Sequence, residues 1–313
     1  MYVPLPARRT EAAHYVYPEH LRPQIALLPR APGVYVFLGD GGPVPLYIGK
    51  SVDIRHRVMD HMRTPQEARL LRQTQRIEYT RTAGDLGAQL LEAQQIKLRQ
   101  PVHNKLLRRR RDLYSIRLLR GRPEVVHSAG VRFSSAQRLY GLYSSRQAAL
   151  QALRAVADDN RLCYGLLGIE RPAAGRPCFR ATIARCAGAC AGREPLAEHE
   201  ARLEAALQER QVAAWPCAGA VGIVEEGADL TQIHVVRDWH YLGSAATRAG
   251  ARRLVAEVDG FDNDGYRILS GPMLGGQLRI MLLRDWRPQT AAARQSARGP
   301  PAPQKPLKLQ GKC

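Results

Sequence analysis

Two short β-type segments, separated by a glycine-rich turn, place the strongest constraint on the fold. Gly33-Val34-Tyr35 opens the first segment, and after eleven intervening residues Tyr47-Ile48-Gly49-Lys50 belongs to the second. The intervening Gly39-Asp40-Gly41-Gly42-Pro43 is typical of a turn. The two segments are therefore predicted to pair as strands, which brings Tyr35 and Tyr47 close together in space.

A helix is predicted directly after this hairpin, with Ser51 as its N-cap. Apolar residues recur along it at every fourth position, as expected for one buried helix face: Ile54, Val58 and Met62. Arg57 and His61 are also four residues apart, so they project together from a neighbouring face.

A later helix carries a carboxylate in an unusual place. Arg76 to Thr80 is predicted as a third strand, and a helix is predicted from Gly84-Asp85 until just before Pro101. Glu92 lies at the edge of the buried arc of that helix, where a carboxylate is costly unless something positive meets it. Asn104 follows Pro101 in a Pro-x-x-Asn segment.

These separated parts resemble the GIY-YIG nucleases. The resemblance rests on residues of the hairpin, the first helix, the second helix and its exit: Tyr35, Tyr47 with Lys50, Arg57, Glu92 and Asn104. It implies an α+β nuclease domain with a small three-stranded sheet and helices. It also implies that Glu92 binds the one catalytic metal ion and that Asn104 closes the site. The plainer alternative is a tyrosine-rich hairpin packed on a helix, with Asp53 and Arg57 as an ordinary ion pair.

The same residues suit phosphodiester hydrolysis. One divalent ion can neutralise a phosphate oxygen and stabilise the leaving oxygen, and an all-oxygen site suits Mg²⁺ or Mn²⁺. Arg57 can stabilise charge that develops on the phosphoryl group. By family analogy Tyr47 is the general base, with Tyr35 hydrogen-bonding nearby, although residue types alone leave these roles exchangeable. The metal, Lys50 and Arg57 would favour the phenolate form of a tyrosine.

By the resemblance to the GIY-YIG nucleases, His61 stands at a position where several members of that family carry a tyrosine. A histidine at this position still provides a ring that can form hydrogen bonds. The alternative is a histidine on the helix surface without a role in the site.

The charge of the 313-residue chain points to a polyanionic partner, with nucleic acid favoured over a membrane surface. Its 47 basic and 28 acidic residues give a formal net charge of +19. Arg108 to Arg111 form a basic run directly after the candidate site, either contacting phosphates or simply solvated. No stretch of about 18 apolar residues is present to span a bilayer, and the N-terminus lacks an apolar signal core, so a cytosolic location is expected.

Four cysteines gather in a short stretch with C-x14-C-x7-C-x3-C spacing: Cys163, Cys178, Cys186 and Cys190. In a cytosolic chain such a group predicts a metal site rather than disulfides. Four thiolates serve both zinc and iron–sulfur clusters. The pattern, with Arg185-Cys186-Ala187-Gly188-Ala189-Cys190 in particular, is similar to the UvrC/Cho excinuclease family and especially to its shorter, Cho-type members. That resemblance favours a [4Fe-4S] cluster over zinc.

The remaining segments give a coarse outline of an α+β C-terminal half. Strands are predicted over 114–119, 124–127 and 131–133, a helix capped by Ser144-Ser145, and an amphipathic helix over 194–211. Further strands are predicted over 219–224, 232–236, 240–242, 266–269 and 278–283, with a helix over 251–258. Asp262-Asn263-Asp264-Gly265 predicts a turn.

The predicted organisation has five parts: a lead-in over 1–28, the nuclease domain over 29–108, linker strands, helix and four-cysteine region over 109–213, a small α+β module over 214–286, and a disordered basic tail over 287–313. The family resemblance implies an SOS-induced excinuclease that makes the 3′ incision beside a lesion in duplex DNA. It implies UvrB as the partner, with UvrA acting upstream. Two alternatives remain: a UvrB-independent GIY-YIG enzyme on branched or foreign DNA, and a non-catalytic, cluster-bearing DNA-binding protein.

Overall fold

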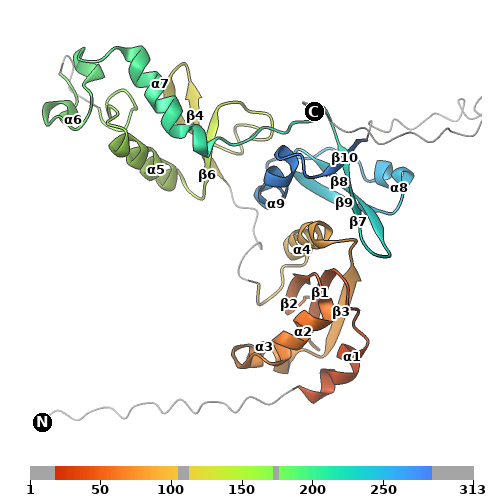
Figure 1. Cartoon of the computed structure of the whole chain (residues 1–313). Coiled ribbons are helices and arrows are strands. Elements are labelled where there is room, and N and C mark those ends of the chain that lie inside the picture. Colours follow the sequence, from red (N-terminus) through yellow and green to blue (C-terminus); the bar gives the residue numbers. More distant parts are fainter. Residues whose placement is uncertain (1–17, 105–112, 172–175, 284–313) are drawn as a thin grey trace, which may run out of the picture. The chain divides into compact units, whose positions relative to one another are not determined.

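The computed structural model describes residues 18–104, 113–171 and 176–283 (Figure 1). The predicted arginine run over 108–111, the first part of the lead-in and the basic tail lie outside these residues. The chain divides into two compact units, one of residues 1–109 with 225–232 and the other of 110–224 with 233–313.

The first unit is a small antiparallel sheet covered by helices on both faces. Its strands are β1 (Gly33–Leu38), β2 (Tyr47–Ser51) and β3 (Arg76–Arg81), in the order β2-β1-β3. Its helices are η1 (Glu19–Leu21), α1 (Arg22–Ala26), α2 (Ile54–Met62), η2 (Pro65–Glu67), α3 (Ala68–Gln73) and α4 (Asp85–Arg99). The predicted hairpin, third strand and α4 are therefore confirmed.

The sequence of β1 explains why it is the central strand. All six of its residues are buried, because alternate side chains enter two different cores. Tyr35 and Phe37 pack with α1, α2 and α3 on one face. Val34 and Val36 pack on the other face, against Ile96 of α4.

The second unit contains two sheets. One has the order β5-β4-β6 and is built from β4 (Tyr114–Leu119), β5 (Arg122–His127) and β6 (Leu139–Tyr143). Helix α5 (Arg146–Asp159) and helix α7 (Leu196–Leu207) pack into the same core. The connections hold α6 (Phe179–Thr182), η3 (Ala189–Ala191) and η4 (Gln208–Arg210). Ser145 caps α5 as predicted, accepting a hydrogen bond from the Ala148 amide.

The other sheet has the order β10-β7-β8-β9. Its strands are β7 (Val221–Glu226), β8 (Thr231–Arg237), β9 (His240–Ala245) and β10 (Arg279–Leu282), accompanied by α8 (Arg248–Arg253) and α9 (Asn263–Leu274). The end of β7, the start of β8 and the turn between them, residues 225–232, belong to the first unit. Within the described residues no helix is both long and apolar enough to cross a membrane.

Three predictions about this half are wrong. Residues 131–133 form no strand, and the third strand of the first sheet is β6 instead. Residues 266–269 are helical, because Asp262 accepts hydrogen bonds from the Asp264 and Gly265 amides and so caps α9 rather than closing a turn. The helix predicted over 251–258 is α8, which begins earlier and ends at Arg253.

Candidate active site

Helix α2 presents two polar side chains to the sheet. It begins after Asp53, whose carboxylate accepts a hydrogen bond from the His56 amide at 2.8 Å. The predicted N-cap, Ser51, is therefore wrong by two residues, because Ser51 bonds to the backbone of Asp53 instead. The predicted apolar stripe is fully buried, which fixes the rotation of α2 and directs the neighbouring face, with Arg57 and His61, toward the tyrosines.

The two tyrosines meet α2 in a compact aromatic cluster. The ring centroids of Tyr35 and Tyr47 are 6.2 Å apart, and that of His61 lies 5.5 Å from Tyr35 and 5.4 Å from Tyr47. Tyr35 pairs in register with Gly49, where a Cβ atom would lie 2.4 Å from the Tyr35 hydroxyl oxygen. Glycine at this position therefore gives the Tyr35 hydroxyl its space.

His61 is buried and has a hydrogen-bond partner on each ring nitrogen. Its Nδ1 is bonded to the Glu67 carboxylate, and its Nε2 lies 2.6 Å from the Tyr35 hydroxyl. Because a carboxylate only accepts, Nδ1 donates to Glu67 and Nε2 accepts from Tyr35. Burial lowers the pKa of His61, although Glu67 opposes this, so the ring is neutral near neutral pH. The alternative of a surface histidine is wrong, since His61 is 3% exposed.

Tyr35 and Tyr47 differ in the causes of their pKa shifts and in their exposure to solvent. Burial and the neighbouring Tyr47 raise the pKa of Tyr35, which is almost fully enclosed and has its hydroxyl directed to His61. Burial and Glu92 also raise the pKa of Tyr47, whereas the positive charge of Arg57 lowers it. Tyr47 is only partly buried. Of the two phenols, Tyr47 is therefore the one that can meet a water molecule at the surface.

Glu92 reaches from α4 to the strand that carries Tyr47. Its Oε1 accepts a hydrogen bond from the Lys50 amide at 3.1 Å, while the Lys50 Nζ donates to Asp85 at 2.8 Å. Within the described residues Oε2 accepts no hydrogen bond, which leaves one carboxylate oxygen for a cation. Burial raises the pKa of Glu92 despite Lys50, and a divalent ion would relieve that cost.

Asn104 secures the outer edge of β2. Its side chain accepts from the Ile48 amide at 3.0 Å and donates to the Ile48 carbonyl at 2.9 Å. The His103 amide continues this edge by donating to the Leu46 carbonyl at 2.8 Å. Asn104 thus holds β2 at the residue that follows Tyr47.

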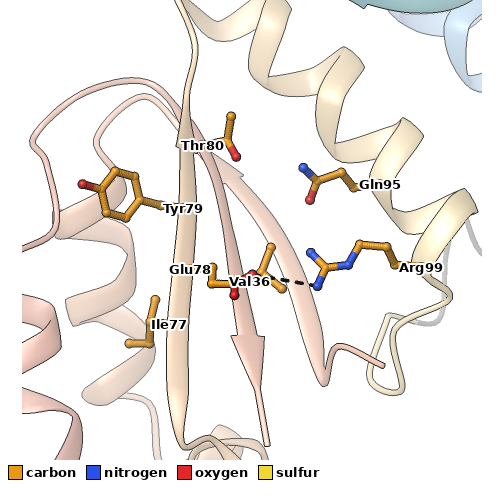
Figure 2. A pocket seen from close by; sticks show the side chains of 7 residues that line it. All are labelled: Val36, Ile77, Glu78, Tyr79, Thr80, Gln95 and Arg99. Carbon is orange, nitrogen blue, oxygen red and sulfur yellow. Dashed lines mark ion pairs between the residues drawn. The ribbon is translucent and has the colours of Figure 1, made fainter. Parts of the chain in front are cut away.

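A groove at the other edge of the sheet is separate from this cluster. It lies between β3 and α4, with Glu78 and Arg99 forming an ion pair across it (Figure 2). Because β3 and β2 are the opposite edge strands, this groove belongs to the side remote from Tyr47.

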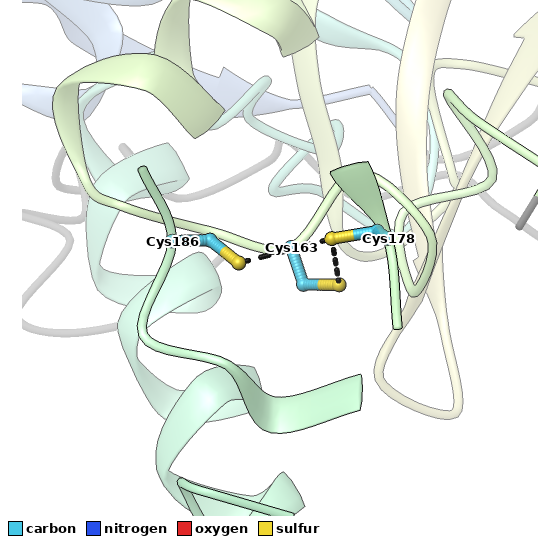
Figure 3. Close-up of side chains that lie close together, drawn as sticks. All are labelled: Cys163, Cys178 and Cys186. Atoms are coloured by element: carbon cyan, nitrogen blue, oxygen red, sulfur yellow. Dashed lines mark hydrogen bonds between the residues drawn. The ribbon is translucent and has the colours of Figure 1, made fainter. Parts of the chain in front are cut away.

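In the second unit the four predicted cysteines come together. The Sγ atoms of Cys163 and Cys178 are 3.4 Å apart, and those of Cys178 and Cys186 are 3.8 Å apart (Figure 3). Cys190 Sγ accepts a hydrogen bond from the Cys178 amide at 3.3 Å. Burial raises the pKa of Cys163 to about 12, which opposes a metal-free thiolate there. Clustered, buried thiols of this kind fit a bound metal centre.

Two carboxylates of the first unit were not predicted from the sequence. Glu67 follows a Thr-Pro turn six residues after His61, and nothing in that spacing predicts that it returns to the histidine ring. From the sequence Asp85 is predicted only to begin a helix, but its carboxylate also accepts a hydrogen bond from the Lys50 ammonium. Both are found only when the tertiary contacts are known.

Comparison with known families matches three parts of the chain. Residues 31–105 match the UvrC-like GIY-YIG domain, residues 114–209 the middle domain of the UvrC/Cho excinucleases, and residues 220–287 the C-terminal domain of excinuclease Cho.

Individual relatives give the same result. The chain is 48% identical to excinuclease Cho of Escherichia coli K12, over 90% of this chain and 95% of the relative. It is 48% identical to that of Salmonella typhi, over 87% and 93%. A solved GIY-YIG N-terminal endonuclease domain of UvrC from Thermotoga maritima, bound to magnesium as its catalytic divalent cation, is 31% identical and covers 28% of this chain and 97% of its own, with a TM-score of 0.25.

Proposed function

Because the chain belongs to the Cho excinucleases of the UvrC/Cho family, we propose that it makes the 3′ incision beside a lesion in duplex DNA during nucleotide excision repair. Membership makes it a UvrC-like GIY-YIG endonuclease of DNA repair. The observation that supports catalysis most directly is the convergence of Tyr47, Arg57 and Glu92 about β2. A non-catalytic DNA-binding protein would not need this combination.

The proposed chemistry is hydrolysis of one phosphodiester bond. A water oxygen attacks the phosphorus, its proton passes to the Tyr47 phenolate oxygen, and the bond to the leaving oxygen breaks. Arg57 holds the phosphoryl oxygens and favours the phenolate form of Tyr47. Tyr35, whose hydroxyl donates to His61, packs beside Tyr47 and holds its ring in place. Mg²⁺ or Mn²⁺ bound by Glu92 would supply charge neutralisation for the phosphate and the leaving oxygen.

Selectivity for damage is expected to come from a partner. The site consists of a carboxylate, phenols and cations, which suit a phosphate and read no base. The net charge of +19 gives salt-sensitive affinity for any DNA and distinguishes no lesion. We therefore propose that UvrB, loaded on the lesion by UvrA, directs the cut, and that the half from Cys163 to about Leu283 contacts UvrB.

Incision of a site-specifically damaged duplex tests this dependence. We expect one 3′ cut with UvrA and UvrB present, and no preference for damaged over undamaged duplex without UvrB. Equal lesion-selective cutting without UvrB would contradict the proposal and favour a nuclease that acts independently on branched or foreign DNA. Mapping of the cut on a labelled strand, at matched salt concentration, provides the measurement.

We further propose that Cys163, Cys178, Cys186 and Cys190 hold a [4Fe-4S] cluster, as the family resemblance implies. A structural zinc ion is the second candidate. It is favoured by the thiol separations of 3.4 and 3.8 Å, since sulfurs about 2.3 Å from one tetrahedral ion lie about 3.8 Å apart. Either centre would supply folding free energy to residues 163–190 rather than take part in the incision.

The metal content distinguishes these two centres. Protein purified without oxygen is expected to be brown, with broad visible absorbance and about four iron atoms per chain. A colourless preparation with stoichiometric zinc would replace the cluster by the zinc site. Cys178→Ser should lower the melting temperature in either case, because binding of the centre is coupled to folding. Cys217→Ser, at a buried cysteine outside the group, is the matched control.

A further inference from the structure

Helix α4 begins without a cap from its own sequence. Its N-cap residue is Gly84, which has no side chain to accept from the first amides of the helix. Those amides need acceptors, because the first turn of a helix has no carbonyls before it.

A carboxylate from far along the chain takes the place of the missing cap. Glu225 Oε1 accepts from the Leu86 amide and Oε2 from the Gly87 amide, both at 2.9 Å. Residues 225–232 belong to the same compact unit as α4. A negative charge at this end also interacts favourably with the helix dipole.

Two further contacts hold the same segment. Gln232 Oε1 accepts from the Ala83 amide at 2.9 Å. The Arg81 guanidinium donates to both carboxylate oxygens of Asp229, at 2.5 and 2.7 Å. The Arg81–Asp229 pair is exposed and adds little by itself, so the cap formed by Glu225 is the central contact.

Gly84 is the residue that makes room for this cap. A Cβ atom at Gly84 would lie 2.4 Å from Glu225 Oε1, too close for both to keep their positions. The backbone at Gly84 is extended, with φ −160°, and any residue can adopt it. A serine there and the Glu225 carboxylate are thus alternative caps that exclude each other.

The capped turn is linked to the candidate active site by two hydrogen bonds. Asp85, the first residue of α4, accepts from the Lys50 Nζ, and the Lys50 amide donates to Glu92. We propose that Glu225 is a positioning residue that holds α4, and with it Glu92, in register with β2. This inference rests on the proposed role of Glu92 as the metal ligand.

The test uses the full chain and three variants: Glu225→Ala, Gly84→Ser, and the two combined. In Glu225→Ala we expect hydrogen exchange at the Leu86 and Gly87 amides to be about five-fold faster, which is the effect expected from the loss of one helix N-cap. We also expect the Mg²⁺ concentration for half-maximal incision to rise by a similar factor, since fewer molecules hold Glu92 in place. Glu209→Ala, at an exposed acid, should change neither quantity.

The double variant should recover both quantities, because the serine hydroxyl caps the helix once the carboxylate is absent. Gly84→Ser alone should change both quantities little, because the serine hydroxyl takes over the cap as the flexible Glu225 carboxylate is displaced. Unchanged amide exchange in Glu225→Ala, or failure of the double variant to recover, would overturn the inference. If Glu92 is not the metal ligand, Glu92→Ala will still cut DNA. Hydrogen exchange at the Leu86 and Gly87 amides measures the cap independently of incision, so the failure of one proposal can be told from the failure of the other.

Discussion

Replacing Glu92 by alanine is expected to reduce the incision rate by about 10³-fold or more, because a metal ion contributes several kcal/mol to the transition state. Glu92 has one oxygen on the Lys50 amide and one left for the ion. DNA affinity should change little, because that affinity comes from the basic surface rather than from one carboxylate. Single-turnover incision at saturating Mg²⁺, with a parallel binding titration, gives both quantities.

A matched control comes from the opposite edge of the same sheet. Glu78 on β3 lies in the groove of Figure 2, where it pairs with Arg99. Glu78→Ala removes an equal charge from the same unit and should leave the incision rate within about two-fold, since exposed ion pairs contribute little. A folded Glu92→Ala protein that still cuts at the wild-type rate would refute the metal assignment.

The sequence predicts those strands and helices of the first unit that are determined by residues close together in the chain. The glycine-rich turn and alternating residues predict β1 and β2, and the four-residue apolar repeat predicts the buried face of α2. Once that face is fixed, Arg57 and His61 must lie together on the next one. The candidate site was therefore largely foreseeable, because most of its residues are placed by elements with strong patterns.

The parts that could not be foreseen depend on contacts between distant residues or on a misread local signal. Glu67 contacts His61, and Glu225 contacts α4, through tertiary packing that produces no repeating pattern in the sequence. In contrast, Asp262 carried a usable signal, since Leu269 and Met273 repeat at helical spacing behind it. Asp262-Asn263-Asp264-Gly265 fits both a turn and a helix N-terminus, and the helical spacing that follows distinguishes the two.

Tyr47→Phe should lower the incision rate by about 10²- to 10⁴-fold, the range for loss of a general base. Tyr35→Phe should cost much less, because the Tyr35 hydroxyl bonds to His61 inside the protein and only supports Tyr47. Both changes remove one oxygen and keep the ring, so the aromatic packing about β2 is preserved in each. Single-turnover rates of the two variants, measured side by side, compare the roles directly.

The pH dependence gives this prediction a second measurement. A base works when deprotonated, and burial and Glu92 raise the pKa of Tyr47 above its ordinary value. Below that pKa the fraction of phenolate, and therefore the wild-type rate, should rise about ten-fold per pH unit. The residual rate of Tyr47→Phe should lose this slope, whereas Tyr35→Phe should retain it. A steep slope that persists in Tyr47→Phe and disappears in Tyr35→Phe would mean that Tyr35 is the base, with its proton exchanged through His61 and Glu67.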